Sequence, residues 1–244
     1  MRRHRPGGPW YGLGCALIGM AQAAAAAPPG VPVADTLTQR LQPCMACHGA
    51  DGRASREGFL PRIAGKPAGY LYQQLINFRD GRRNNTAMAG LLAFQSDAYL
   101  REIAAYFAAI DLPHNPPPAT SADAGTLARG RQLARDGDPA RRLPACSACH
   151  GPALAGATPA VPGLLGLPRD YLNAQLGAWK AGKRRAHAPD CMQAVVARLS
   201  DGDINAISSY LAAQALPANT KPSINAPPLA NGQVAVTCGN TAKP

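Results

Sequence analysis

Large aromatic side chains and methionines are scarce in this chain of 244 residues. Phe, Trp and Tyr together make up only 5% of the residues, and there are five methionines, whereas Gly and Pro are abundant. Apolar residues still reach 46%, an ordinary share for a globular protein, so the chain can bury a core. A core with few aromatic rings must fill its volume in another way, and a bulky prosthetic group would do so.

Long apolar runs are also missing beyond the N-terminus, since no later segment approaches the ~20 residues that a membrane-spanning helix needs. The N-terminus itself has a basic start, MRRHR, followed by a short apolar stretch that ends in small residues. This pattern is typical of an export signal, and we expect cleavage near Ala25 to Ala27, which removes residues 1–27. An uncleaved anchor or a lipid-modified Cys15 is the alternative, although Cys15 lies in the middle of the apolar run. The sequence predicts a soluble, periplasmic protein.

Acidic residues are few, with 14 Asp and Glu against 25 Lys and Arg. Loss of the signal would remove three arginines and leave a net charge of +8. A basic exported protein often binds acidic partners or anionic surfaces. Nucleic acid is not an expected partner, because the basic residues are scattered and no aromatic residues are interleaved with them.

A six-residue motif occurs twice, as CMACHG at residues 44–49 and CSACHG at residues 146–151. C-x-x-C-H is the attachment signature of haem c. Residues three and four apart share one face of a helix, so two thiols and an imidazole meet the same haem. A thioredoxin-like dithiol requires no following His, and a zinc site does not suit two pairs so far apart. The sequence predicts two covalently bound haem c groups, held by Cys44, Cys47 and His48, and by Cys146, Cys149 and His150.

The repetition extends beyond these motifs. Matched pairs include Pro61 with Pro162, Gly65 with Gly166, Tyr70 with Tyr171, Gln74 with Gln175, Gly81 with Gly182, Met88 with Met192, and Ser96-Asp97 with Ser200-Asp201. Internal repetition of this length indicates two copies of one domain. A proline-rich segment that cannot continue a helix separates them. We predict domains at residues 28–112 and 123–216, a linker at 113–122, and an irregular tail at 217–244.

The expected fold class is all-α, because no stretch alternates with a period of two. Ser96 and Ser200 are helix N-cap signals before apolar residues at helical spacing. Residues 70–80 and 171–181 are predicted helices that end before glycines. Residues 125–135 form a further predicted helix before the second motif, and its counterpart at residues 35–42 is shorter.

Each haem iron needs a second axial ligand besides its histidine. Met88 and Met192 follow the two histidines by 40 and 42 residues, at matched positions of the repeat. We expect His/Met ligation at both irons, a pairing that raises the reduction potential. His187 lies five residues before Met192 and remains a rival ligand, although its repeat position is matched to Arg83. His114 lies in the linker and is expected to be solvated.

These features together resemble the di-haem cytochrome c4 class, which consists of two tandem class I cytochrome c domains joined by a linker. The resemblance covers nearly all of the chain after the signal, except the tail. It implies an electron carrier of the periplasm whose two haem groups lie close enough to exchange electrons. It also implies that the carbonyl groups of Pro61 and Pro162 accept hydrogen bonds from the δ-nitrogens of His48 and His150.

The principal functional hypothesis is a carrier of single electrons without catalysis of its own, since two methionines close both irons. An electron-accepting cytochrome subunit of a periplasmic dehydrogenase is an alternative, and a di-haem peroxidase, which needs an open iron, is a third. Redox proteins are the expected partners, among them acidic proteins and a membrane-bound oxidase or dehydrogenase. Basic clusters at residues 81–83 and 182–185 suit either haem propionates or an acidic partner, or are solvated helix ends.

Two cysteines remain after haem attachment. In an oxidising compartment we expect Cys191 and Cys238 to form a disulfide, which would hold the tail over the second domain and steady a loop that carries Met192. A buried free Cys191 and an intermolecular bridge through Cys238 are the alternatives.

Overall fold

The computed structural model describes residues 35–54, 58–117, 119–224 and 238–239. The helices and strands reported below belong to one compact unit, Thr36–Pro244. The expected export signal at residues 1–27 lies outside the described residues. Within the part of the chain that the structure describes, no helix is long and apolar enough to cross a membrane.

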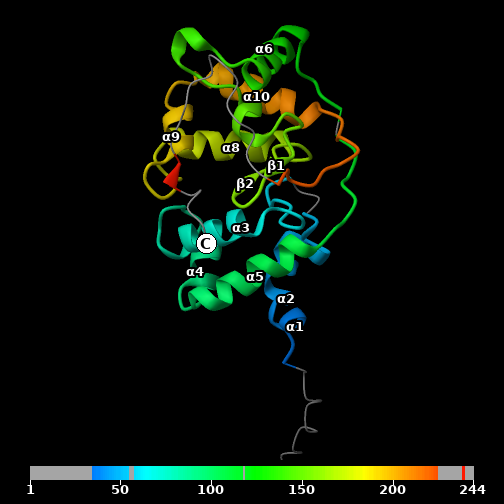
Figure 1. Cartoon of the computed structure of the whole chain (residues 1–244), viewed down its shortest axis with the longest axis vertical. Coiled ribbons are helices and arrows are strands. Elements are labelled where there is room, and N and C mark those ends of the chain that lie inside the picture. Colours follow the sequence, from blue (N-terminus) through cyan, green and yellow to red (C-terminus); the bar gives the residue numbers. More distant parts are fainter. Residues whose placement is uncertain (1–34, 55–57, 118, 225–237, 240–244) are drawn as a thin grey trace, which may run out of the picture. The chain divides into compact units, whose positions relative to one another are not determined.

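The protein is mostly helical, which confirms the predicted fold class (Figure 1). The first copy of the repeat contains α1 (Leu37–Arg40), α2 (Gln42–His48), η1 (Ala50–Gly52), α3 (Ala68–Arg79), α4 (Thr86–Leu92) and α5 (Asp97–Ala109). The second copy contains α6 (Ala124–Arg135), η2 (Pro139–Arg141), α7 (Cys146–His150), α8 (Arg169–Lys180), α9 (Cys191–Val196) and α10 (Asp201–Ala213). A small antiparallel hairpin of β1 (Gly156–Ala157) and β2 (Val161–Pro162), which we did not predict, follows α7.

Polar side chains begin several helices where the sequence predicts them. Ser96 accepts a hydrogen bond from the backbone N–H of Tyr99 at the start of α5. Ser200 does the same with Asp203 at the start of α10, and the Asp203 carboxylate accepts from the Ser200 N–H in return, which completes a capping box. These caps fix where the last helix of each copy starts.

Two local expectations need correction. The region around Met192 is the helix α9 rather than a loop, because Asp190 caps it by accepting from the N–H of Gln193. The short helix expected at residues 35–42 is divided into α1 and α2, and α2 continues through the first C-x-x-C-H motif.

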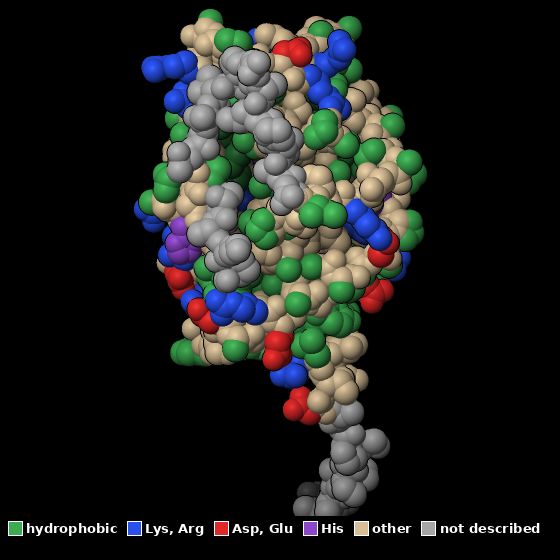
Figure 2. Space-filling model, viewed as in Figure 1, with side chains coloured by type: hydrophobic (Ala, Val, Ile, Leu, Met, Phe, Trp, Pro, Cys, Tyr) green, Lys and Arg blue, Asp and Glu red, His purple; other side chains and the backbone are tan. Residues whose placement is uncertain are grey.

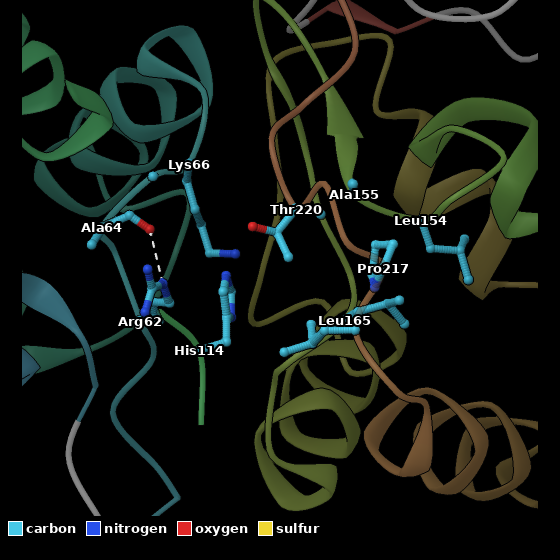
Figure 3. A pocket seen from close by; sticks show the side chains of 12 residues that line it. Arg62, Ala64, Lys66, His114, Leu154, Ala155, Leu165, Pro217 and Thr220 are labelled. Carbon is cyan, nitrogen blue, oxygen red and sulfur yellow. Dashed lines mark hydrogen bonds between the residues drawn. The ribbon is translucent and has the colours of Figure 1, made fainter. Parts of the chain in front are cut away.

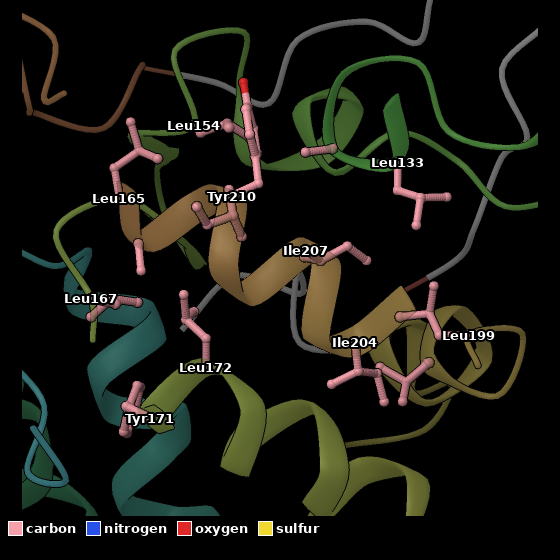
Figure 4. Packing of buried hydrophobic residues seen from close by; sticks show 14 of the residues in the cluster. Leu133, Leu154, Leu165, Leu167, Tyr171, Leu172, Leu199, Ile204, Ile207 and Tyr210 are labelled. Atoms are coloured by element: carbon pink, nitrogen blue, oxygen red, sulfur yellow. The ribbon is translucent and has the colours of Figure 1, made fainter. Parts of the chain in front are cut away.

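Each copy has its own hydrophobic core. In the first copy α5 packs against α3, and in the second copy α10 packs against both α6 and α8. Figure 4 shows the second core, in which Leu133 of α6, Leu172 of α8 and Ile207 of α10 are buried together. Gly130 permits the close approach of α6 to α10, because a Cβ at this position would lie 2.1 Å from the carbonyl oxygen of Ala206.

The segment between the copies forms no helix over the described residues 110–117 and 119–123, and it is tied to both copies. The buried guanidinium of Arg62 donates to the carbonyl oxygens of Leu112 at 2.6 Å and Pro113 at 3.1 Å. His114 packs against Gly166, whose Cβ, if present, would lie 2.7 Å from His114 Nδ1. His114 is therefore half-buried and not solvated as expected, because the linker lies against the protein.

Candidate haem-binding sites

The two C-x-x-C-H motifs lie on short helices of the same kind. Cys44, Cys47 and His48 end α2, and Cys146, Cys149 and His150 form α7. A glycine with positive φ follows each histidine, so the chain turns away at once. All four cysteines of the motifs are free thiols. Each helix therefore presents two thiols and one imidazole within a turn and a half.

The thiols do not resemble those of a dithiol oxidoreductase. Burial raises the pKa of Cys44 and of Cys149, and it raises the pKa of Cys146 to about 11. A catalytic C-x-x-C pair instead holds one thiol at a low pKa so that it reacts as the thiolate. The buried environment of these thiols favours covalent attachment sites over thiol–disulfide chemistry.

Both motif histidines are oriented by a proline carbonyl. The oxygen of Pro61 lies 2.9 Å from Nδ1 of His48, and the oxygen of Pro162 lies 2.7 Å from Nδ1 of His150. A carbonyl can only accept, so Nδ1 carries the proton and Nε2 keeps its lone pair for a metal. Burial also lowers the pKa of both histidines, which favours the neutral form that binds iron.

A cavity of about 180 Å³ opens beside the second motif. Voids larger than a water molecule are few in protein interiors, so a cavity of this size marks a binding site rather than a packing defect. The residues that line it include Cys146, Cys149, His150 and Met192, together with apolar side chains such as Leu172 and Ile207. The second motif and its expected second ligand therefore share one apolar chamber.

The two rival ligands of the second site differ in their position relative to the cavity. Met192 on α9 lines the cavity and packs against the second core, whereas His187 is not among the residues that line it. In the first copy, Met88 on α4 and Cys44 on α2 pack against the same core. Each methionine is thus associated with the core that carries its motif.

The disulfide between Cys191 and Cys238 is present, which confirms that prediction. Both cysteines line the second cavity, and Cys191 directly precedes Met192. The next residue, Gly239, donates its N–H to the carbonyl oxygen of Pro189 at 2.8 Å. Cys238 and Gly239 of the tail are therefore fixed against the segment that leads into α9.

Two arginines meet two glutamines where the copies of the repeat join. Arg184 donates to Gln175 of its own copy at 2.7 Å and to Gln74 of the other at 3.0 Å. Arg83 donates to Gln74 at 3.1 Å and to Gln175 at 2.5 Å. The guanidinium of Arg184 also lies 3.7 Å from the ring centroid of Trp179. Arg83 and Arg184 thus occupy equivalent places, so Arg83 corresponds to Arg184 in the repeat, and our match of Arg83 to His187 was wrong.

This junction is rich in positive charge. Arg184 is only 5% exposed, and burial lowers its pKa to about 10. Among the residues that the structure describes, no carboxylate forms a salt bridge with Arg83, Arg184 or Lys66. A buried cation needs a counter-charge. The two propionates that a haem group carries would supply it at this edge of the second cavity.

A buried hydrogen-bond donor without a partner also indicates an anionic group at the second cavity. Trp179 lines the second cavity, and its buried indole Nε1 has no hydrogen-bond partner. Buried N–H groups are rarely left unpaired, and each one calls for an explanation. An anionic group held in the cavity would accept this hydrogen bond. The apolar walls, the free thiols, the oriented histidine and the basic edge all fit covalently bound haem c.

Comparisons with known proteins agree with this site. A family model described as "Cytochrome c" matches residues 127–215. Cytochrome c4 of Pseudomonas aeruginosa is 40% identical over 170 residues, which cover 69% of this chain and 82% of the relative. The chain belongs to the cytochrome c4 family. It is therefore a c-type cytochrome of the electron-transfer class with covalently bound haem c, and both C-x-x-C-H motifs fit as attachment sites.

Other similar proteins extend the comparison. The crystal structure of reduced recombinant cytochrome c4 from Pseudomonas stutzeri has a TM-score of 0.61 and 33% identity, and it covers 71% of this cytochrome and 94% of that chain. A protein named thiosulfate dehydrogenase electron acceptor, from Thiomonas intermedia, is 38% identical over 71% of this cytochrome and 79% of its own length.

Sequence reasoning missed part of the site of this cytochrome. It matched Gln74 with Gln175 but treated both only as positions in a helix. It considered the basic clusters but could not tell which side chains are buried, and the structure shows that Arg184 is. Lys66 received no attention, although it lines the second cavity. The matched spacing of Gln74 and Gln175 was the one signal that could have indicated a symmetric contact.

Proposed function

We propose that this cytochrome is a periplasmic carrier that moves single electrons between respiratory redox partners, with His/Met ligation at both irons. The observation that carries the proposal is the matched set of residues in the two copies: an oriented histidine, two free thiols and a methionine, each set on its own core. Haem c, when bound, supplies the one-electron redox couple. The protein holds it, excludes water from it and sets its potential.

The residues of the chain would perform these tasks by their positions. His48 and His150 present Nε2 to the iron because the proline carbonyls hold Nδ1. Met88 and Met192 would complete the coordination and so leave no position for a substrate. An iron closed in this way changes little between its two oxidation states, which suits electron transfer and disfavours catalysis. For this reason we propose a carrier and not a di-haem peroxidase.

Export to the periplasm is supported by the N-terminal pattern of residues 1–27. A second candidate function has a redox enzyme of the same compartment as the partner. The similarity to a relative named thiosulfate dehydrogenase electron acceptor supports this candidate. In that case the cytochrome would be the electron-accepting subunit of a dehydrogenase. On the face shown in Figure 2, Lys and Arg side chains lie at several separate places, which fits transient contacts with acidic redox proteins.

The test is spectroscopy of the purified, exported protein together with its intact mass. We expect a mass that corresponds to two haem groups and to loss of about the first 27 residues, and an oxidised spectrum with Met-to-iron charge-transfer absorption and no high-spin signal. A mass with one haem or none would overturn the proposal. A high-spin fraction equal to one haem per protein would instead support an enzyme with an open iron.

A further inference from the structure

Lys66 is a residue of the first copy that reaches the haem site of the second. The second cavity is lined not only by its own copy but also by Lys66, Tyr70, Gln74 and Asn77. Tyr70, Gln74 and Asn77 are three or four positions apart and share one face of α3, and Lys66 lies just before this helix. The first copy therefore supplies one wall of the second site.

The corresponding face of the second copy differs at one informative position. Tyr70 and Gln74 have the same residue types at Tyr171 and Gln175. Both of these second-copy residues accept hydrogen bonds from Arg83 across the junction. Lys66 has no such equivalent, because the residue after the matched glycine of the second copy is Leu167. The junction is symmetric in its hydrogen bonds and asymmetric in its charge.

No carboxylate among the described residues of the protein pairs with Lys66. Figure 3 shows its amine beside His114 and facing Thr220 across a small pocket, with Arg62 below. The neighbouring Arg62 is itself positive, and it is held by the backbone oxygens of Ala64, Leu112 and Pro113. Burial lowers the pKa of His114 to about 4, which leaves that imidazole neutral at pH 7.

Lys66 itself keeps its proton at neutral pH. Burial lowers the pKa of its amine to about 8, with the nearby Tyr171 and Arg62 acting in opposite directions, so most molecules remain charged at pH 7. A cation in a partly dry site acts over a longer range than one in water, because the effective dielectric constant is lower. Its field therefore reaches the cavity that it lines.

We propose that Lys66 raises the reduction potential of the second haem and so shifts the internal electron equilibrium towards the second site. This inference rests on the proposed function of the protein as an electron carrier. Reduction adds one negative charge at the iron, which a nearby cation stabilises. With haem bound at both sites, the transferred electron would leave the ferrous first haem and reduce the ferric second haem, and this step would require no proton.

The test measures both potentials by spectroelectrochemical titration of the complete two-haem protein at pH 7. Lys66→Met removes the charge and keeps the length of the side chain, Lys66→Arg keeps the charge, and Lys183→Met removes a charge from an exposed position of the second copy. We expect Lys66→Met to lower only the potential of the second haem and to shift the internal equilibrium about threefold or more towards the first. Lys66→Arg should retain most of the parent's potential at the second haem. Lys183→Met should change both potentials little, because water and salt screen the charge of Lys183.

The assignment of the two couples comes from a Cys44→Ala/Cys47→Ala variant, in which the couple that remains belongs to the second haem. Unchanged potentials in Lys66→Met, equal shifts of both, or a fall of the first alone would each overturn the inference. If Lys66 had only a structural role, Lys66→Arg, which keeps the charge, would not restore the potential of the second haem. If two haem groups and reversible one-electron couples are present but Lys66→Met is silent, this inference fails while the proposed function stands. If the couples themselves are missing, the proposed function fails.

Discussion

Cys191 is joined to Cys238 by a disulfide, and the residue next to it is Met192, the expected ligand of the second iron. The bond closes a loop with a sequence separation of 47 residues. It fixes the start of α9 to the tail, and both sulfur atoms belong to residues that line the second cavity. Cys238 of the tail is thus part of the site.

A Cys191→Ala/Cys238→Ala variant should be less stable. Loss of the bond returns conformational freedom to the unfolded chain, which by the loop length corresponds to up to about 4 kcal/mol in the free energy of unfolding. We also expect a weaker Met-to-iron absorption at one haem of the two. Denaturant unfolding and the optical spectrum of the oxidised protein measure these effects. Equal stability of variant and parent would show that the bond makes no net contribution.

Replacement of either ligand methionine should open one iron. Met192→Ala should lower the potential of the second haem and allow a small ligand such as imidazole to bind there, and Met88→Ala should do the same at the first. Met45→Leu is the matched control, because Met45 lies inside the first C-x-x-C on α2 and packs against the core. The readouts are ligand titration and the charge-transfer absorption. If Met192→Ala retains the full absorption, His187 or another group is the ligand.

Asp203 should make stability depend on pH. Burial alone would raise its pKa, but hydrogen bonds from Arg141, Ser200 and Arg129 hold the pKa well below its usual range. Because the folded-state pKa is the lower one, the stabilisation is complete above the unfolded value of about 4 and is lost as the pH falls below it.

Asp203→Asn should therefore reduce the free energy of unfolding at pH 7 by about 1 to 3 kcal/mol, since both arginines are partly exposed and their pairing is screened. The same variant should lose less stability than the parent between pH 5 and 3. Thermal unfolding at several pH values checks both statements, and parallel pH profiles for the two proteins would contradict them.

Two glycines inside helices should respond in opposite directions to the same substitution. Gly130→Ala places a methyl group against the backbone of α10 and should cost about 1 to 3 kcal/mol. Gly177→Ala on α8 meets nothing within 4 Å, so it should be neutral or stabilising by up to about 1 kcal/mol. Denaturant unfolding of the two variants gives the comparison. A stable Gly130→Ala would mean that α6 can move away from α10 at little cost.

Much of this molecule could be predicted from its sequence because the informative patterns are local. The spacing of Cys146, Cys149 and His150 within a turn and a half of helix predicts the attachment site without knowledge of the rest. Helix starts at Ser96 and Ser200 are equally local, since each cap bonds to a residue three positions later.

The remaining features depend on contacts between distant residues. Arg184 and Gln74 are 110 positions apart, so no local pattern could predict their hydrogen bond. The repeat changes offset between Arg184 and Met192, where the second copy has additional residues, and this change misled the match of Arg83. The contribution of Lys66 to the other copy's site was hidden for the same reason.

The backbone contact where the copies join has a wider consequence. Arg83 and Arg184 form an antiparallel bridge, flanked by bonds from Asn84 N to Lys183 O at 3.1 Å and from Arg185 N to Arg82 O at 2.7 Å. Each bond is the image of the other under exchange of the two copies, which is the geometry of an isologous contact in a homodimer. Two separate copies of one domain could form the same pair of bonds. The covalent connection then contributes a high effective concentration to this contact, and its own contacts with Arg62 and Gly166 help to hold the two copies. It also frees the two halves to diverge, so that one site can acquire a charge that the other lacks.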